Sequence, residues 1–124
     1  MKEVKYQTKG VTIPNGTTST TVVGFDVTLD ATVKRCIGVA VYTVGATAGS
    51  TGMQLGLKGE GGKVYQDITH IGDWESSHQL LHGHRYKDFN FPSNQTVRLE
   101  FRPTANLVAD VKYDVVFKLD DSHV

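Results

Sequence analysis

Histidines are concentrated in one short stretch of the sequence, with His78, His82 and His84 inside seven residues. Residues at i and i+4 share a helix face, so His78 and His82 could bind one metal ion, with Asp73 or Glu75 completing the shell. The stretch lacks the His-Glu-x-x-His spacing and therefore the general-base carboxylate of the zinc proteases. The same residues could be solvated loop histidines. They could also lie at a subunit contact that loosens when the imidazoles are protonated at about pH 6.5. Ligand spacing alone gives many false positives, so we expect no bound metal or cofactor.

Large aromatic side chains occupy the same region as the histidines. Trp74, Tyr86 and Phe89 fall where the sequence is irregular, and each is interpreted either as a plug for one end of the fold or as a contact anchor. Plugging is favoured, because a small sandwich needs such a lid. A sugar-binding platform would use similar rings. These three aromatics, with His78, His82 and His84, are the candidate interface or ligand residues.

Groups for nucleophilic catalysis are weakly represented. Cys36, the only cysteine, sits in an apolar run, where a thiol behaves as a small hydrophobe with a raised pKa. Ser76 and Ser77 precede His78, but adjacency in sequence is not triad geometry, and there is no Gly-x-Ser-x-Gly motif. No set of nucleophile, base and orienting residue emerges, so we predict a protein that is not an enzyme.

The elements that must position these residues are predicted to be β-strands. The chain of 124 residues contains 16 Val and 14 Thr against 8 Leu, 6 Ala and 4 Glu. Branched side chains suit a pleated sheet, whereas straight-chain and small residues favour helices. The length supports one domain with a single core, over residues 1–124.

Alternation of apolar and polar residues predicts the individual strands. It runs through residues 4–8, 11–13, 23–29, 53–58, 64–68, 89–91, 97–102 and 111–119. Residues 35–44 are apolar on both faces, which predicts a central strand, and Gly38 and Ala40 imply that something packs closely over its second face. Glycines at 59, 61 and 62 predict a β-hairpin between residues 53–58 and 64–68. The only helix expected is short and spans residues 74–82, between Asp73 as cap and Gly83.

About eight strands at this spacing predict an all-β fold, an antiparallel β-sandwich of jelly-roll type. The same alternation would serve an immunoglobulin-like strand order, so both orders stay open. Residues 1–13 are expected to form an edge strand or a strand exchanged with a neighbouring subunit.

Charge and hydropathy narrow the functional classes. The 13 basic and 13 acidic residues cancel, which argues against nucleic-acid binding. The first residues lack the apolar stretch of a secretory signal, and no window approaches the roughly 18 apolar residues that would span a membrane. A product made in the cytoplasm, with neither a nucleic-acid nor a membrane partner, is therefore expected.

The chain resembles the small all-β accessory or decoration proteins of tailed-phage virions. The resemblance rests on the neutral sandwich pattern, the Gly-rich hairpin around residues 55–67, the following segment 69–71 and the closing strand 113–119. It implies a structural role in the virion, contacts with the capsid or other virion proteins, and homo-oligomers that are often trimers. It supplies no catalytic residue.

We therefore expect a structural or assembly protein, in particular a virion accessory protein that binds or decorates the capsid. One alternative is a carbohydrate-binding or receptor-binding module centred on Trp74 and Tyr86. Another is a metal-binding, cupin-like jelly roll that uses His78, His82 and His84. In that pattern, histidines would stand on strands and point inward, whereas here they fall outside the predicted strands.

Overall fold

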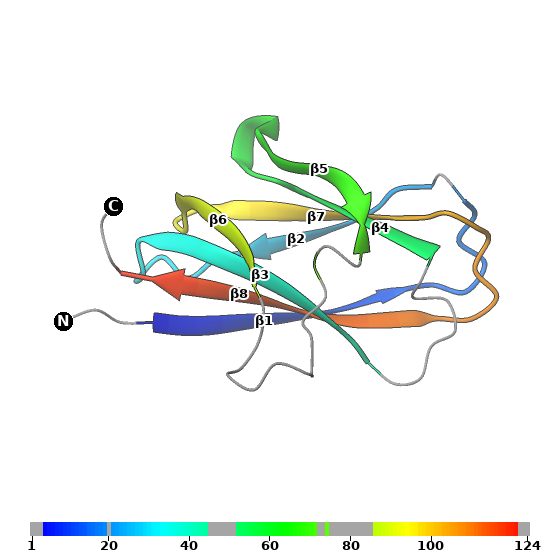
Figure 1. Ribbon diagram of the computed structural model, residues 1–124. Coiled ribbons are helices and arrows are strands. Elements are labelled where there is room, and N and C mark those ends of the chain that lie inside the picture. The colour runs from blue at the N-terminus through cyan, green and yellow to red at the C-terminus, as the bar shows by residue number, and fades with distance from the viewer. Residues whose placement is uncertain (1–3, 20, 45–51, 72–73, 75–85, 122–124) are drawn as a thin grey trace.

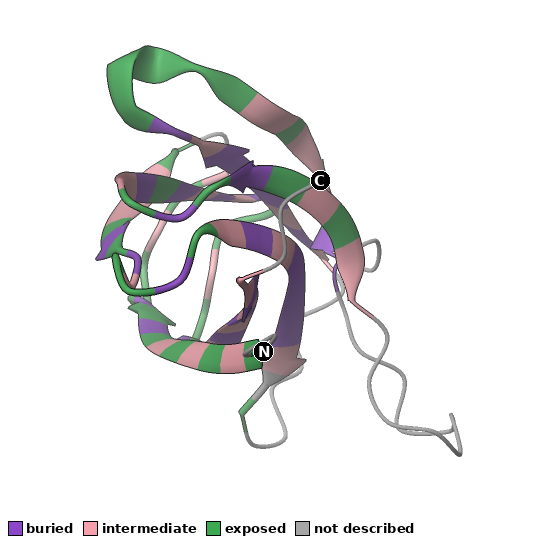
Figure 2. Ribbon diagram, turned by 90° about the vertical axis from the view of Figure 1, so that its left-hand side faces the viewer, coloured by how far each residue is buried: buried purple, intermediate pink, exposed green. Residues whose placement is uncertain are grey.

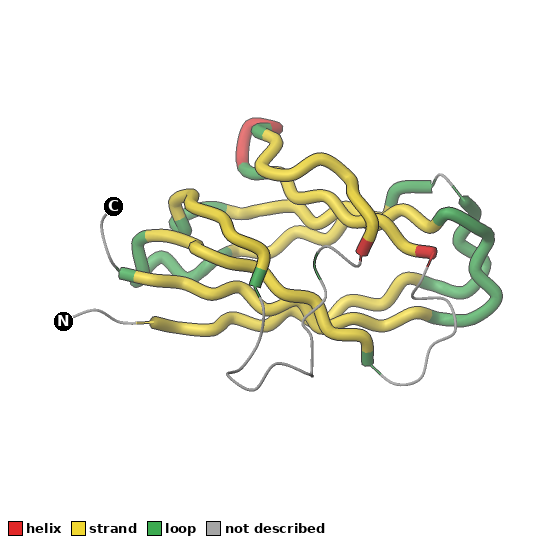
Figure 3. Tube along the Cα trace, viewed as in Figure 1, coloured by secondary structure: helices red, strands yellow, loops and turns green. Residues whose placement is uncertain are grey.

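The computed structural model describes residues 4–19, 21–44, 52–71, 74 and 86–121, and within them the chain forms eight strands and the 3-10 turn η2 (Figures 1 and 3). The elements in chain order are β1 (Val4–Ile13), β2 (Val23–Thr28), β3 (Arg35–Thr43), β4 (Met53–Lys58), η2 (Glu60–Gly62), β5 (Val64–His70), β6 (Lys87–Pro92), β7 (Thr96–Pro103) and β8 (Val111–Asp120). The prediction of an all-β sandwich of eight strands is confirmed.

The strands form two four-stranded antiparallel sheets that face each other. Sheet A has the order β1-β8-β3-β6, and sheet B has the order β2-β7-β4-β5. Four of the pairs nest inside one another along the chain, namely β1 with β8, β2 with β7, β3 with β6 and β4 with β5. Such a nested set of pairs, rolled so that β8 also meets β3 and β7 meets β4, is the jelly-roll order. The structure thus decides between the two strand orders that the alternation left open.

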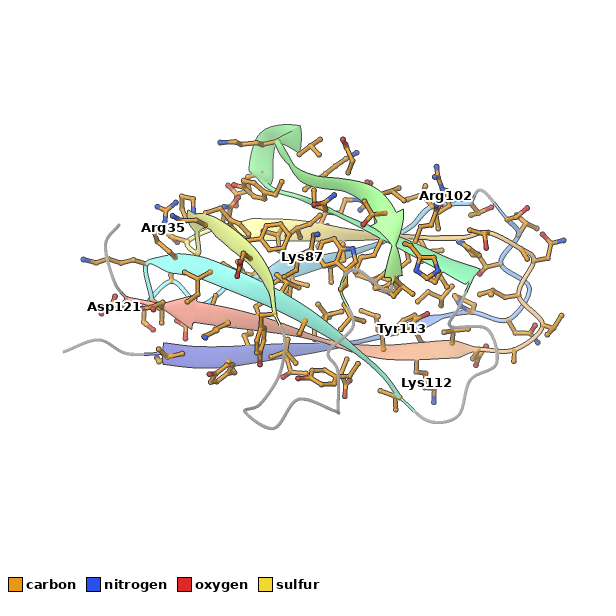
Figure 4. All side chains as sticks on the ribbon, viewed as in Figure 1. Arg35, Lys87, Arg102, Lys112, Tyr113 and Asp121 are labelled. Atoms are coloured by element: carbon orange, nitrogen blue, oxygen red, sulfur yellow. The ribbon has the colours of Figure 1, made fainter. Side chains whose placement is uncertain are left out.

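The core lies between the sheets and consists of the inward residue of every second position (Figure 2). On β8, Tyr113, Val115, Phe117 and Leu119 are fully buried. Figure 4 shows Lys112 and Tyr113 on opposite sides of this strand, as the pleat requires. The inward positions of the central strands are apolar, so these strands themselves offer no metal ligands of the kind that a cupin-like site would use.

Strand β3 is central in sheet A, between β8 and β6, as its two apolar faces predict. A β-bulge lies between Cys36 and Gly38 in its pairing with both neighbours. The bulge leaves Cys36, Val39 and Val41 in the core and places Gly38 and Ala40 on the outer face. These two small residues therefore mark the place where another group can approach the sheet closely.

The edge strand β1 is paired along its whole length with β8 of its own chain. In its first half the inward positions are polar, and Gln7 closes the gap to the end of β2. The Gln7 side chain donates from Nε2 to the Thr28 carbonyl over 2.8 Å and accepts at Oε1 from the Asp30 amide over 2.9 Å. The amide group thus takes the place of a neighbouring peptide and satisfies backbone groups that would otherwise be exposed at a sheet edge.

The local predictions agree with the described strands to within about two residues at most ends, and the hairpin β4–β5 is present, with its turn extending away from the sandwich (Figure 1). Residues 4–8 and 11–13 form one continuous strand. The helix expected over residues 74–82 lies outside the described residues, apart from Trp74, which is in a turn.

Candidate functional site

Trp74 belongs to the core. Its side chain is 1% exposed, its ring stacks on Phe89 with centroids 5.6 Å apart, and its Nε1 donates to Thr69 Oγ1 over 3.1 Å. Its carbonyl accepts a hydrogen bond from the Val41 amide over 2.9 Å. The indole therefore closes the sandwich between β5 and β6, and its faces are not available to stack on a ligand.

Phe89 is half-buried against the same part of the core. It meets Phe91 edge to face at 5.9 Å, and Phe91 in turn stacks on Tyr65 at 4.2 Å with an interplanar angle of 9°. Together with Trp74, these rings join the edge of sheet A at β6 to the edge of sheet B at β5. Aromatic pairs of this kind contribute about 0.5–1.5 kcal/mol beyond the area they bury.

His78, His82 and His84 lie outside the described residues. Within the described part of the chain, no three His, Cys, Asp or Glu residues gather closely enough to hold a metal ion. Burial raises the pKa of the Cys36 thiol to about 12, so the thiolate required of a nucleophile is scarce at neutral pH.

Tyr86 is the third predicted site residue that lies in the described part of the chain, and it contacts residues of sheet A. Its side chain lies over Gly38, where an added Cβ would come within 2.9 Å of the Tyr86 Cβ. The Tyr6 ring is 6.1 Å from the Tyr86 ring, and Lys118 Nζ lies 5.7 Å from the Tyr86 centroid. Desolvation, together with a hydrogen bond to Tyr42, raises the pKa of Tyr86 to about 12. We call Tyr6, Tyr42 and Tyr86 the tyrosine cluster.

The tyrosine cluster occupies the outer face of sheet A. The registers place Tyr6, Lys118 and Gly38 in one row across β1, β8 and β3. Ala40 and Val116 form the next row, and Tyr42 follows. Tyr6 is 58% exposed, so more than half of this residue is accessible to solvent. Aromatic side chains such as tyrosine are enriched at protein–protein contacts.

The outer face of sheet B differs in character. A chain of ion pairs crosses it: Asp26 to Arg98 at 3.6 Å, Arg98 to Glu100 at 3.3 Å, and Glu100 to Lys58 at 3.1 Å. The Arg98 guanidinium lies over Gly24, where an added Cβ would come within 2.1 Å of it. Because these charges are already paired with one another, the outer face of sheet B is a solvated surface, unlike the aromatic outer face of sheet A.

Two shallow surface grooves accompany these faces. The larger, of about 470 Å³, lies beside β1 and is lined by Lys5, Tyr6, Gln7, Thr28, Asp30 and Leu119. Lys5 and Asp30 pair across it at 3.5 Å. The smaller, of about 250 Å³, lies between β5 and the charged face of sheet B. Tyr6 thus belongs to both the tyrosine cluster and the larger groove.

Sequence reasoning missed Tyr6, Tyr42 and Lys118 as parts of a site. The available signal was Gly38 and Ala40, which predicted a close contact over β3 without saying which residue makes it. Tyr6 and Tyr86 are 80 positions apart, and only the strand order brings them together.

Comparisons with known proteins find likenesses of fold only. No family model matches the sequence, and no curated protein matches it. A crystal structure of FlhE is 10% identical, with a TM-score of 0.49, and the match covers 98% of each chain. Dimeric latent PorU from Porphyromonas gingivalis is also 10% identical, with a TM-score of 0.36 over 94% of this chain and 13% of that one. These comparisons identify no phage accessory protein.

The described part of the chain has no helix long and apolar enough to cross a membrane.

Proposed function

We propose that this protein is a non-catalytic assembly or binding protein that contacts another protein through the outer face of sheet A. The observation that carries the proposal is the tyrosine cluster on its bed of small residues. The Tyr86 side chain is packed over Gly38 and hydrogen-bonded to Tyr42, so its position is already fixed without a partner. Rigid aromatic groups lose little conformational entropy on binding, which is why they are frequent at interfaces.

The apolar interior supports a non-enzymatic role. The residues buried between the sheets form one hydrophobic cluster, and the buried Cys36 thiol is held in its protonated form. The outer faces of the two sheets also differ in the groups that they present to solvent. Sheet B presents paired charges to solvent, whereas sheet A presents Tyr6, 58% exposed, beside the cationic Lys118.

A narrower form of the proposal makes the partner a capsid or another virion protein, with the chain as a homo-oligomeric accessory of a tailed-phage virion. It is supported by the sequence resemblance and by the jelly-roll order, which viral capsid proteins also use. In this form the protein is made in the host cytoplasm and needs neither a nucleic acid nor a membrane. Co-sedimentation with purified capsids tests it directly, and no co-sedimentation at saturating protein would reject it.

The general proposal is tested with immobilised wild type, Tyr6→Ser and the matched surface variant Asp67→Ser. Proteins retained from a lysate are identified, purified and titrated against each variant. Truncating a central aromatic is expected to weaken the complex roughly tenfold or more, while Asp67→Ser on sheet B leaves it unchanged. Equal affinity for wild type and Tyr6→Ser would contradict the proposal. Binding on a glycan array that is lost in Tyr86→Ala would instead favour the carbohydrate-binding alternative.

A further inference from the structure

The charged residues on the outward side of β8 are spaced so that reversing the strand places each positive charge at the position of a negative one. The outward residues in order are Lys112, Asp114, Val116, Lys118 and Asp120. If the strand is turned end to end about Val116, Lys118 falls on Asp114 and Lys112 falls on Asp120. The pattern is therefore complementary to a reversed copy of itself.

The neighbouring strand β1 repeats the same relationship in shape. Tyr6 is registered with Lys118, Thr8 with Val116, and Gly10 with Asp114. Reversal about the row of Thr8 and Val116 places Tyr6, a 58% exposed ring, opposite Gly10. A Cβ built at Gly10 meets only Asp114 Oδ1, at 3.5 Å, so the surface there is open to an incoming ring.

From this geometry we propose that the outer face of β1 and β8 binds a second copy of this chain, face to face, about a twofold axis that crosses the strands at Thr8 and Val116. The inference rests on the proposed function, because it names the partner of the same face. A twofold contact uses the same patch on both subunits, so Lys118–Asp114 and Tyr6–Gly10 contacts each occur twice. The Val116 side chains meet at the axis.

Charge selects this arrangement over the other face-to-face one. With the axis parallel to the strands and over β8, Lys118 would meet Lys118 and Asp114 would meet Asp114. Like charges placed opposite each other at an interface raise the dissociation constant by about a hundredfold or more. The row over β3 adds little to the contact area in either case, because Tyr86 already covers Gly38 and Ala40 is fully buried.

The twofold contact also distinguishes the inference from the trimer that the sequence resemblance implies. A closed trimer joins two different patches of each subunit, whereas a self-complementary patch gives dimers or assemblies that contain twofold axes. A discrete trimer in solution would therefore overturn it.

The test is charge reversal, measured by sedimentation equilibrium over a concentration series of the full chain. Asp114→Lys and Lys118→Asp are each expected to raise the dimer dissociation constant at least tenfold, because each creates like-charge contacts. The double variant D114K/K118D restores opposite charges in the reversed copy and is expected to return to within about threefold of wild type. Asp67→Lys on sheet B is the control for net charge and should leave the constant unchanged. Circular dichroism melts establish that each variant is folded.

Gly10→Tyr gives a second measurement that does not depend on charge. The added Cβ makes only an ordinary 3.5 Å contact in the monomer, and the ring beyond it would fill the position that Tyr6 of the second copy would take, so dimers should be lost while circular dichroism melts show that the fold is kept.

A wild type that stays monomeric up to about 1 mM, a dimer unaffected by the single reversals, or a double variant that is not restored would overturn the inference. If the wild type is monomeric but Tyr6-dependent capture of another protein persists, the second copy is wrong and the proposed function stands. If neither occurs, both fail.

Discussion

Tyr86 lies directly over Gly38, and a Cβ at position 38 would come within 2.9 Å of the Tyr86 Cβ and 3.5 Å of the Lys87 carbonyl. A strand position normally favours a branched residue. Glycine weakens a strand because it loses more backbone entropy on folding and has no side chain to pack. The glycine at position 38 is thus explained by the ring above it. The contact fixes the chain where it returns to β6 and holds the tyrosine cluster on sheet A.

Gly38→Val is expected to destabilise the protein by about 1–3 kcal/mol, the usual cost of overpacking, despite the better strand propensity of valine. The free energy of unfolding is measured by urea denaturation at low protein concentration. Gly10→Val is the matched control on β1, the edge strand of the same sheet, where the nearest atom is 3.5 Å from the added Cβ, and it should be neutral or slightly stabilising. In a Tyr86→Gly background, which removes the Cβ as well as the ring, the cost of Gly38→Val should largely disappear, and equal costs in both backgrounds would disprove the contact.

Trp74→Ala is expected to cost about 3–5 kcal/mol, because it leaves a cavity between Phe89 and Thr69 at the open side of the sandwich. Trp74→Phe keeps most of the volume and loses only the hydrogen bond to Thr69, so its cost should be nearer to about 1 kcal/mol. Thermal melts measure both. As Trp74 is the only tryptophan, native fluorescence should have the short emission wavelength of a buried indole and shift to the red on unfolding. Red-shifted native emission would argue against the plug.

The strands could be predicted from the sequence because each depends on local alternation. Residues such as Val97, Leu99 and Phe101 show their inward side in the pattern alone, and all three are buried. The strand order could not be predicted in the same way. Val4 pairs with Asp120, which is 116 positions away, and nothing in the sequence of either strand indicates which strand it pairs with.

The candidate site divides in the same way between local and long-range information. The sequence identifies Trp74 as a large residue in an irregular region, but burial is a property of what surrounds it, so the plug and the platform both fit the sequence. Tyr86 was recognised for the same reason. Tyr6 was not, because its role depends on the row it shares with Lys118 and Gly38, which exists only once β8 lies between β1 and β3.

Cys36 is expected to be inert in the native protein. Burial raises its pKa to about 12, well above its ordinary value of 9.0, so the thiolate fraction at pH 8 is very small and the sulfur is shielded from reagents. Labelling with an aromatic disulfide at pH 8 should proceed at the rate of unfolding and become fast in urea. The sign of the linkage follows: the folded state keeps its proton where the unfolded thiol loses it, so this contribution to stability falls as the pH rises above about 9. Rapid stoichiometric labelling without denaturant would contradict the buried position.

Asp30 provides a pH dependence of the opposite sign. Its pKa is lowered from 3.8, first by a hydrogen bond from the Thr32 hydroxyl over 2.6 Å and next by the Thr32 amide over 2.8 Å, with a smaller contribution from Lys5. A carboxylate with a lowered pKa stabilises the folded state above its unfolded pKa, and this stabilisation is lost as the pH falls through the folded pKa.

Thr32→Val removes the hydroxyl and keeps the amide, so the Asp30 pKa should move upward toward 3.8, as followed by the chemical shift of its carboxyl carbon during acid titration. Lys5→Met is the matched variant, and it should move the pKa less because the lysine ranks after both Thr32 contacts and is screened by solvent. The difference in unfolding free energy between wild type and Thr32→Val should be largest at pH 6 and should shrink as the pH falls through the Asp30 pKa, because it depends on the charged carboxylate. A larger shift in Lys5→Met than in Thr32→Val would show that the ion pair, and not the hydroxyl, holds the Asp30 carboxylate in its charged form.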